Sequence, residues 1–450
     1  MKNSLTEGKV IRVLIMFAIP YMLSSFLQTL YGMADLYIVG QYNGADALSA
    51  VSIGSQFMHM LTVIIIGLAM GSTVRLGNAI GREDEKDASF IVGNTILLFM
   101  GVSIVFTVIL LCNISLIVQW MSTPQEAIAY TTSYLKVCFV GIPFIFAYNV
   151  MSSLLRGTGD SRSPMYFVFI ACIMNVFLDY LFVGYFSMGA TGAALATVLA
   201  QALSFIVGLF FIFVKKPFYF SIHKSDFQWH LQTMKDIVVS GLPIALQDGF
   251  IQISFLIITI ITNSRGLIFA TGVGITEKII SFLFLIPSSF LSALSVCVAQ
   301  NIGAKKRKRA QQMLYYGLMI TVSFGIISAI ICQIFPKQMI GLFTYDREVI
   351  DAGSLYLMSY AWDCIFASIH FCFSGYFCGC NKAMISFLHN IISILCVRIP
   401  GAYLASQIFP NTLYPMGWAA PLGSILSGVI CILFYLYLLK NETGNNRALA

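Results

Sequence analysis

Long apolar stretches follow one another along almost the whole chain, separated by short polar segments. Runs of this kind predict twelve helices, each long enough at about 1.5 Å per residue to cross a hydrocarbon core of roughly 30 Å. The predicted spans are residues 10–38, 46–75, 88–114, 127–153, 162–184, 189–214, 236–262, 267–299, 311–334, 349–377, 384–408 and 415–439. The pattern therefore predicts an all-α integral membrane protein with twelve transmembrane helices.

Composition supports this interpretation. Of the 450 residues, 58% are hydrophobic and only 10% are charged, whereas a soluble domain has roughly 25% charged residues. The first apolar stretch has no small-residue cleavage site, so we expect a retained helix and not a removed signal peptide. The 11 cysteines lie almost wholly in or beside the predicted spans. Without paired CxxC motifs, they are expected to be small packing residues and not metal ligands.

The basic residues are distributed unevenly between the loops on the two sides of the predicted membrane. The loops on one side hold only Arg265, Lys337 and Arg347. The other side has both termini and the loops after spans 2, 4, 6, 8 and 10, with Lys2, Lys9, Arg12, Arg75, Arg82, Lys86, Arg156, Arg162, Lys215, Lys216, Lys224, Lys235, Lys305, Lys306, Arg307, Lys308, Arg309, Lys382, Lys440 and Arg447. The positive-inside rule therefore predicts that both termini are cytoplasmic in a cell (inner or plasma) membrane. The net charge of +7 is then mainly a topology signal, and no nucleic-acid partner is expected.

The chain also contains an internal duplication. Short motifs recur 222 or 223 residues apart, namely Ile80-Gly81 with Ile302-Gly303, Tyr134-Leu135 with Tyr356-Leu357, Gly157 with Gly379, and Pro20 with Pro243. Six spans per half is an even number, so both halves have the same orientation. They are predicted to be related by a pseudo-twofold axis along the membrane normal. The expected domains are an N-lobe at 1–214, a polar cytoplasmic linker at 215–235 and a C-lobe at 236–450.

Two carboxylates lie deep in the apolar sequence of the first half, at Asp35 and Asp179. Gln28 and Tyr31 precede Asp35 by seven and four residues, and Asn175 precedes Asp179 by four, so each acid shares a helix face with polar groups. A charged side chain at mid-bilayer costs about 2.5 to 3.5 kcal/mol by insertion scales and usually has a function. These acids therefore predict a site for a proton or another cation.

The duplication provides an internal comparison for these two acids. The positions that correspond to Asp35 in the second half are Ile257 or Ile258, and the position that corresponds to Asp179 is Gly401. Helix packing in the second half therefore does not need a carboxylate at either place. This comparison favours a functional role over a structural one.

At this point a family resemblance emerges. The run Gln28-Thr-Leu-Tyr-Gly-Met-Ala-Asp35, the segment Gly77-Asn-Ala-Ile-Gly81, the segment Arg156-Gly-Thr-Gly-Asp160, and Asn175 with Asp179 resemble the multidrug and toxic compound extrusion (MATE) family. The resemblance covers essentially the whole chain and is nearest to the bacterial DinF-type branch. One departure is Tyr180, which stands where many relatives have proline.

The resemblance implies a secondary antiporter that exports amphipathic, often cationic compounds in exchange for H⁺ or Na⁺ by alternating access. It implies a cation-coupling site at Asp35, Asn175 and Asp179. Its implied polar neighbours are Gln28, Tyr31, Asn149 and Thr197, and the first helix is expected to bend at Pro20. No cofactor is expected apart from the coupling ion, no metal apart from Na⁺ at these three residues, and the partners are small organic substrates and the lipid bilayer around a monomer.

The choice of ion stays open. Burial favours the neutral form of a carboxyl group, so such a group can take up a proton near neutral pH. Amide oxygens beside two carboxylates can instead complete an oxygen shell around Na⁺.

The second half has its own polar residues within predicted spans. Asp248 lies between Gln247 and Gln252, and Asp363 lies in span 10. Asp248, Gln252 and Asp363 are candidate substrate contacts. Glu277 and Arg398 are further charged residues of this half, and Arg398 is a candidate partner for one of its acids.

Two other functions were weighed. A lipid-linked saccharide flippase would have a related architecture, but it should carry more basic residues facing its cavity to hold diphosphate. A membrane-embedded enzyme is the second alternative. The sequence lacks the metalloprotease, serine-hydrolase and Walker motifs, so an enzyme has no support.

Overall fold

The computed structural model describes residues 5–121, 123–215, 217–218 and 220–448, and these residues are almost wholly helical. Two of the basic residues counted above, Lys2 and Lys216, lie outside them. The first half contains α1 (Val10–Tyr42), α2 (Ala45–Gly81), α3 (Glu85–Cys112), α4 (Ile114–Trp120), α5 (Ile128–Val140), α6 (Ile142–Gly157), α7 (Arg162–Asp179) and α8 (Gly189–Lys215). The second half contains α9 (Leu231–Asn263), α10 (Leu267–Gly303), α11 (Arg307–Ile334), α12 (Pro336–Gly341), α13 (Arg347–Tyr360), α14 (Asp363–Gly379), α15 (Ala383–Ser393), α16 (Ile399–Ile408), α17 (Tyr414–Gly417) and α18 (Ala419–Ala448).

The apolar stretches fold as the sequence predicts. Within the described ranges, 10 helices are long and apolar enough to cross a membrane, and the bent pair α5 and α6 makes up to 11. This pair turns by 50° at Gly141, where the sequence predicts one span at 127–153. The predicted span 349–377 consists of two shorter helices, α13 and α14, because the chain leaves helical geometry at residues 361–362. The all-α membrane fold is confirmed.

The helices form two compact units. Unit 1 comprises residues 5–7, 15–245 and 299–305, and unit 2 comprises residues 8–14, 246–298 and 306–448. The boundaries fall inside α1, α9 and α10, so these three helices contribute to both units. The predicted domain boundaries at 214 and 236 stay a prediction.

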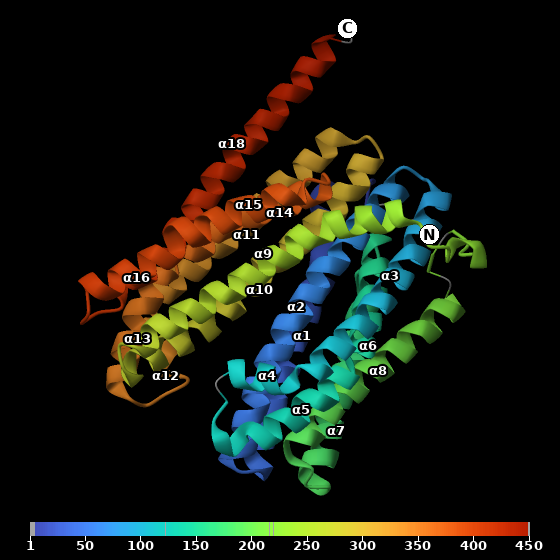
Figure 1. Ribbon diagram of the computed structural model, residues 1–450. Helices are drawn as coiled ribbons and strands as arrows, with labels where there is room; N and C mark the ends of the chain where they lie inside the picture. Colours follow the sequence, from blue (N-terminus) through green and yellow to red (C-terminus); the bar gives the residue numbers. More distant parts are fainter. Residues whose placement is uncertain (1–4, 122, 216, 219, 449–450) are drawn as a thin grey trace. The chain divides into compact units, whose positions relative to one another are not determined.

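In unit 1, α2 packs against α5 and α6, and α7 runs beside α8 (Figure 1). The buried face of α8 is built from small residues, among them Ala190, Gly192 and Ala193. Small side chains let helix backbones approach closely, which drives helix association where lipid replaces water. The opposite face carries large apolar groups such as Phe210 and Phe213, which are 69% and 71% exposed. This is the pattern of a helix that is solvated by lipid.

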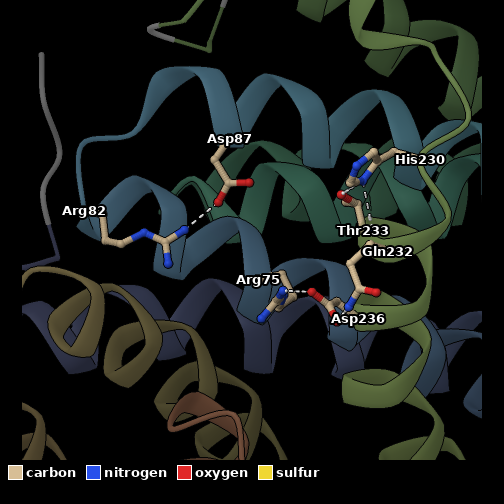
Figure 2. Close-up of polar contacts among 7 residues, drawn as sticks. All are labelled: Arg75, Arg82, Asp87, His230, Gln232, Thr233 and Asp236. Carbon is tan, nitrogen blue, oxygen red and sulfur yellow. Dashed lines mark hydrogen bonds and ion pairs between the residues drawn. The ribbon is translucent and has the colours of Figure 1, made fainter.

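The first part of α9 crosses α2 within unit 1 at glycines. A Cβ atom at Gly241 would lie 2.2 Å from the carbonyl oxygen of Leu68, and one at Gly71 would lie 2.3 Å from the carbonyl oxygen of Ile237. Only glycine permits this approach. Figure 2 shows Arg75 of α2 facing Asp236 of α9 one turn beyond the crossing, and their side chains form an ion pair.

In unit 2, α11 packs against α14, and α14 packs against α18 (Figure 1). Arg265, in the turn between α9 and α10, donates hydrogen bonds to the carbonyl oxygens of Phe409, Pro410 and Thr412 at 2.7 to 3.0 Å. It therefore joins this turn to the segment between α16 and α17. The sequence treats Arg265 only as one of the few basic residues on its side of the membrane.

Candidate functional site

Asp35 lies on α1 and is 5% exposed. Its Oδ2 atom accepts a hydrogen bond of 3.2 Å from the hydroxyl of Thr197 on α8. The same hydroxyl accepts a hydrogen bond of 3.4 Å from the side-chain amide of Asn175 on α7. Three helices of unit 1 thus contribute to one chain of polar contacts.

Asp179 is the last residue of α7 and is fully buried. It lies one helical turn beyond Asn175, and its carboxyl group is within hydrogen-bonding reach of the carboxyl group of Asp35. The helix does not end there, because a π-helical turn, Tyr180–Tyr185, follows directly. The backbone N–H of Tyr180 is hydrogen-bonded to the carbonyl oxygens of Val176 and Phe177. Proline could not supply this donor, so tyrosine permits the continued helix at this position.

The oxygen atoms at this site are short of donors. Asp35 Oδ1, Asn175 Oδ1 and both carboxylate oxygens of Asp179 are buried without a hydrogen-bond partner. Buried polar atoms are almost always paired, so four unpaired acceptors around one point require an explanation. A proton shared by the two carboxyl groups would supply a donor, and a monovalent cation would be bound by the same oxygens. The donor set therefore fits either coupling ion.

The predicted polar neighbours differ in how close they come to this site. Tyr31 interacts electrostatically with Asp35, and its phenol contacts the side chain of Gln201 on α8. Gln201 was missed in the sequence, although it lies one turn beyond Thr197 on the same helix face. Asn149 is hydrogen-bonded at 2.8 Å to the carbonyl oxygen of Ile145 in its own helix. Gln28 is half-buried and makes no hydrogen bond to these groups in the described part of the chain.

The candidate contacts in the second half lie at separate places. Asp248 is half-buried on α9 near Cys378 of α14, and its neighbour Gln247 accepts a hydrogen bond of 2.6 Å from Ser386. Gln252 lies one turn further along α9. No hydrogen bond or ion pair joins Asp248 or Gln252 to Asp363 among the described residues.

Asp363 instead lines an internal cavity of about 50 Å³ in unit 2. The same cavity is lined by Arg398 at the end of the π-helical turn Ile394–Arg398, by His370, and by Phe255, Phe284 and Phe371. Asp363 is 2% exposed. The sequence separates these residues by more than 140 positions, so only the fold reveals the shared cavity.

Comparison with known proteins assigns the family. The MatE family model matches residues 20–181 and 243–404, so the same model occurs twice, 223 residues apart. This agrees with the duplication seen in the sequence. The probable multidrug resistance protein YpnP of Bacillus subtilis is 28% identical over 432 residues, and the match covers 96% of each protein. The probable multidrug resistance protein NorM of Thermotoga maritima is 27% identical, covering 97% of this chain and 95% of that protein.

Solved structures give the same result at the level of the fold. A crystal structure of a MATE protein in complex with MaL6 has a TM-score of 0.92 at 21% identity and covers 98% of both chains. An outward-facing multidrug resistance MATE transporter of the MOP superfamily has a TM-score of 0.89 and covers 98% of this chain and 97% of that one. These relatives are transporters, which excludes the membrane-embedded enzyme. Because the family model matches well over half of the residues, this chain is a multi-pass membrane transporter of the MatE family.

Proposed function

We propose that this transporter exports small, amphipathic, often cationic organic compounds from the cytoplasm in exchange for an inward H⁺ or Na⁺. The observation that carries this proposal is the group of four unpaired buried oxygens of Asp35, Asn175 and Asp179. A site of this kind changes its charge when it takes up a cation, and the loaded and empty states then favour different arrangements of the protein.

The energetics are sufficient for coupling. A 100-fold gradient of a neutral compound requires about 2.7 kcal/mol, and a monovalent cation crossing about 150 mV releases about 3.5 kcal/mol. One ion per cycle therefore suffices for a neutral substrate. A monovalent cationic substrate exchanged for one ion moves no net charge, so the ion's concentration gradient must drive that exchange.

Other parts of the chain have proposed roles in this cycle. Asp248, Gln252 and Asp363 are proposed substrate contacts, and Pro20 is the proposed bending point of α1. The transporter is proposed to act as a monomer in the cell membrane with both termini in the cytoplasm. The uneven distribution of Lys and Arg supports this orientation. The coupling ion is the only small ligand required apart from the substrate.

A lipid-linked saccharide flippase is supported less well. A diphosphate-bearing substrate needs several basic groups facing its path. The cavity of unit 2 has Arg398 as its only basic side chain among the described residues that line it, beside the carboxylate of Asp363. This mixture of charges does not match a diphosphate.

The test is transport of a fluorescent organic cation into inverted membrane vesicles under separately imposed H⁺ and Na⁺ gradients. Asp35→Asn and Asp179→Asn should each abolish gradient-driven movement, while the purified variants still fold. Asp46→Asn is a matched control, because Asp46 is an exposed acid at the start of α2, and it should transport normally. Normal transport by both site variants would overturn the proposal.

A further inference from the structure

The cavity of unit 2 has two opposite charges that do not form an ion pair. Asp363 and Arg398 both line it, yet Asp363 Oδ1 and Arg398 Nε have no hydrogen-bond partner in the described part of the chain. The Nδ1 atom of His370, which also lines the cavity, is likewise unpaired. In a medium of low dielectric, unlike charges attract strongly, so an acid and an arginine that share a cavity would normally close on each other.

Arg398 is held in place by other groups. Its guanidinium donates a hydrogen bond of 2.9 Å to the hydroxyl of Tyr360. It also lies over the ring of Phe255, 4.5 Å from the ring centroid. Glu277 of α10 is a further charge that acts on Arg398, and its Oε1 atom is unpaired as well. The arginine is thus oriented in advance on one wall of the cavity, with Asp363 on another.

The duplication shows that this arrangement is particular to the second half. The two matches to the family model are offset by 223 residues, so Arg398 occupies the position that corresponds to Asn175. A neutral amide in the candidate ion site is therefore replaced by a permanent positive charge. The second half is accordingly not a copy of the ion site of the first half.

The cavity suits a small group that carries both charges. Its volume of about 50 Å³ exceeds that needed for one water molecule and accommodates a small polar group such as a carboxylate. Arg398 matches a carboxylate, because a guanidinium presents a planar array of donors. Asp363 matches an ammonium group. Phe255, Phe284 and Phe371 provide apolar walls next to these charges.

We propose that Arg398 and Asp363 bind the polar end of a zwitterionic organic compound, with its carboxylate on Arg398 and its ammonium group on Asp363. This inference rests on the proposed export of organic compounds and defines one class of them. The compound is bound in the second half, away from the ion site.

The test is equilibrium binding to the purified protein in detergent, with two fluorescent probes that differ by one carboxylate. Nε-dansyl-lysine is a zwitterion at its free end, and dansylcadaverine has the same chain with the ammonium group alone. The wild-type protein should bind dansyl-lysine at least about tenfold more tightly, since a hydrogen-bonded charge contributes a factor of this size. Equal or weaker binding of dansyl-lysine would overturn the proposal, and this measurement needs no variant.

Variants then assign the two contacts. Arg398→Gln should remove the preference for dansyl-lysine, and Arg398→Lys should restore part of it. Asp363→Asn should weaken the binding of both probes. Lys278→Gln is a matched control, because Lys278 is an exposed cation of the same unit that does not line the cavity, and it should keep the preference. If Arg398→Gln weakens both probes equally, or neither, the carboxylate does not bind there.

This test is separable from that of the proposed function. Binding in detergent needs no ion gradient, so normal transport by Asp35→Asn would overturn ion coupling and leave the binding preference as evidence for the cavity. Loss of transport in Asp35→Asn together with no preference between the probes would overturn the cavity proposal alone.

Discussion

The hydroxyl of Thr197 donates a hydrogen bond of 3.2 Å to the carboxylate of Asp35, which joins α8 to α1 within unit 1. A donor of this kind stabilises the ionised form of a carboxyl group and so opposes protonation. Thr197 therefore tunes the group that is proposed to take up the ion.

Replacing Thr197 by valine should make protonation of Asp35 easier. The loss of a hydrogen bond worth about 1 kcal/mol corresponds to a little under one pH unit. Under an imposed proton gradient, transport should reach half its maximal rate at a pH higher by about that amount. Thr197→Ser keeps the donor and should behave as the wild type. A shift to lower pH in the valine variant, or an equal shift in both variants, would contradict the assigned contact.

Replacing Gly241 by alanine should destabilise the protein, because the new Cβ atom would lie 2.2 Å from the carbonyl oxygen of Leu68. Overpacking typically costs about 1 to 3 kcal/mol, which outweighs the gain of about 1 kcal/mol from replacing glycine in a helix. The measurement is the thermal unfolding temperature in detergent. Gly249→Ala is the control on the same helix, since a Cβ atom there meets nothing within 4 Å. Equal changes in the two variants would show that the α2–α9 crossing does not depend on glycine.

Breaking the ion pair between Arg75 and Asp236 (Figure 2) should have only a small effect on stability. Both side chains are about one-third exposed, at 34% and 33%, and ion pairs of this kind contribute at most about 1 kcal/mol. Asp236→Asn should therefore lower the unfolding temperature by a few degrees at most. The double exchange Arg75→Asp with Asp236→Arg should recover part of the loss. A decrease as large as that of Gly241→Ala would mean that the ion pair, and not the glycine contact, holds this crossing together.

Replacing Arg265 by alanine should destabilise unit 2 by about 2 kcal/mol or more, because three carbonyl oxygens lose a charged donor. Limited proteolysis of the 409–413 segment in detergent would detect its release. Lys337→Ala is a control, since Lys337 pairs with Asp351 at an exposed position. Unchanged proteolysis in the Arg265 variant would show that other contacts hold the segment.

The amino-acid sequence predicts much of this molecule because lipid imposes a simple rule on it. Helices must satisfy their own backbone groups in a membrane, so long apolar stretches translate directly into α1, α2, α3 and the other long helices. The bend at Gly141 was not predicted, since glycine inside an apolar stretch gives no direction of turning. Asn175 and Asp179 could be paired from spacing alone because one helical turn separates them.

Other contacts depend on which helices become neighbours. Spacing gives no reason to place Thr197 beside Asp35, and the resemblance to relatives supplied that expectation. Gln201 was not expected at all. The cavity shared by Asp363 and Arg398 joins α14 to a segment outside it, and no local pattern encodes such a pairing.

The π-helical turn Tyr180–Tyr185 has a consequence for how this span is numbered against its relatives. A π-helical turn holds one residue more than an α-helical turn, so every side chain beyond it is rotated by roughly 100° relative to an uninterrupted helix. Asn175 and Asp179 lie before this point and keep their common face. A residue after Tyr185 that aligns with a relative without such a turn therefore faces a different neighbour, and functional roles should be transferred by position in space and not by alignment column.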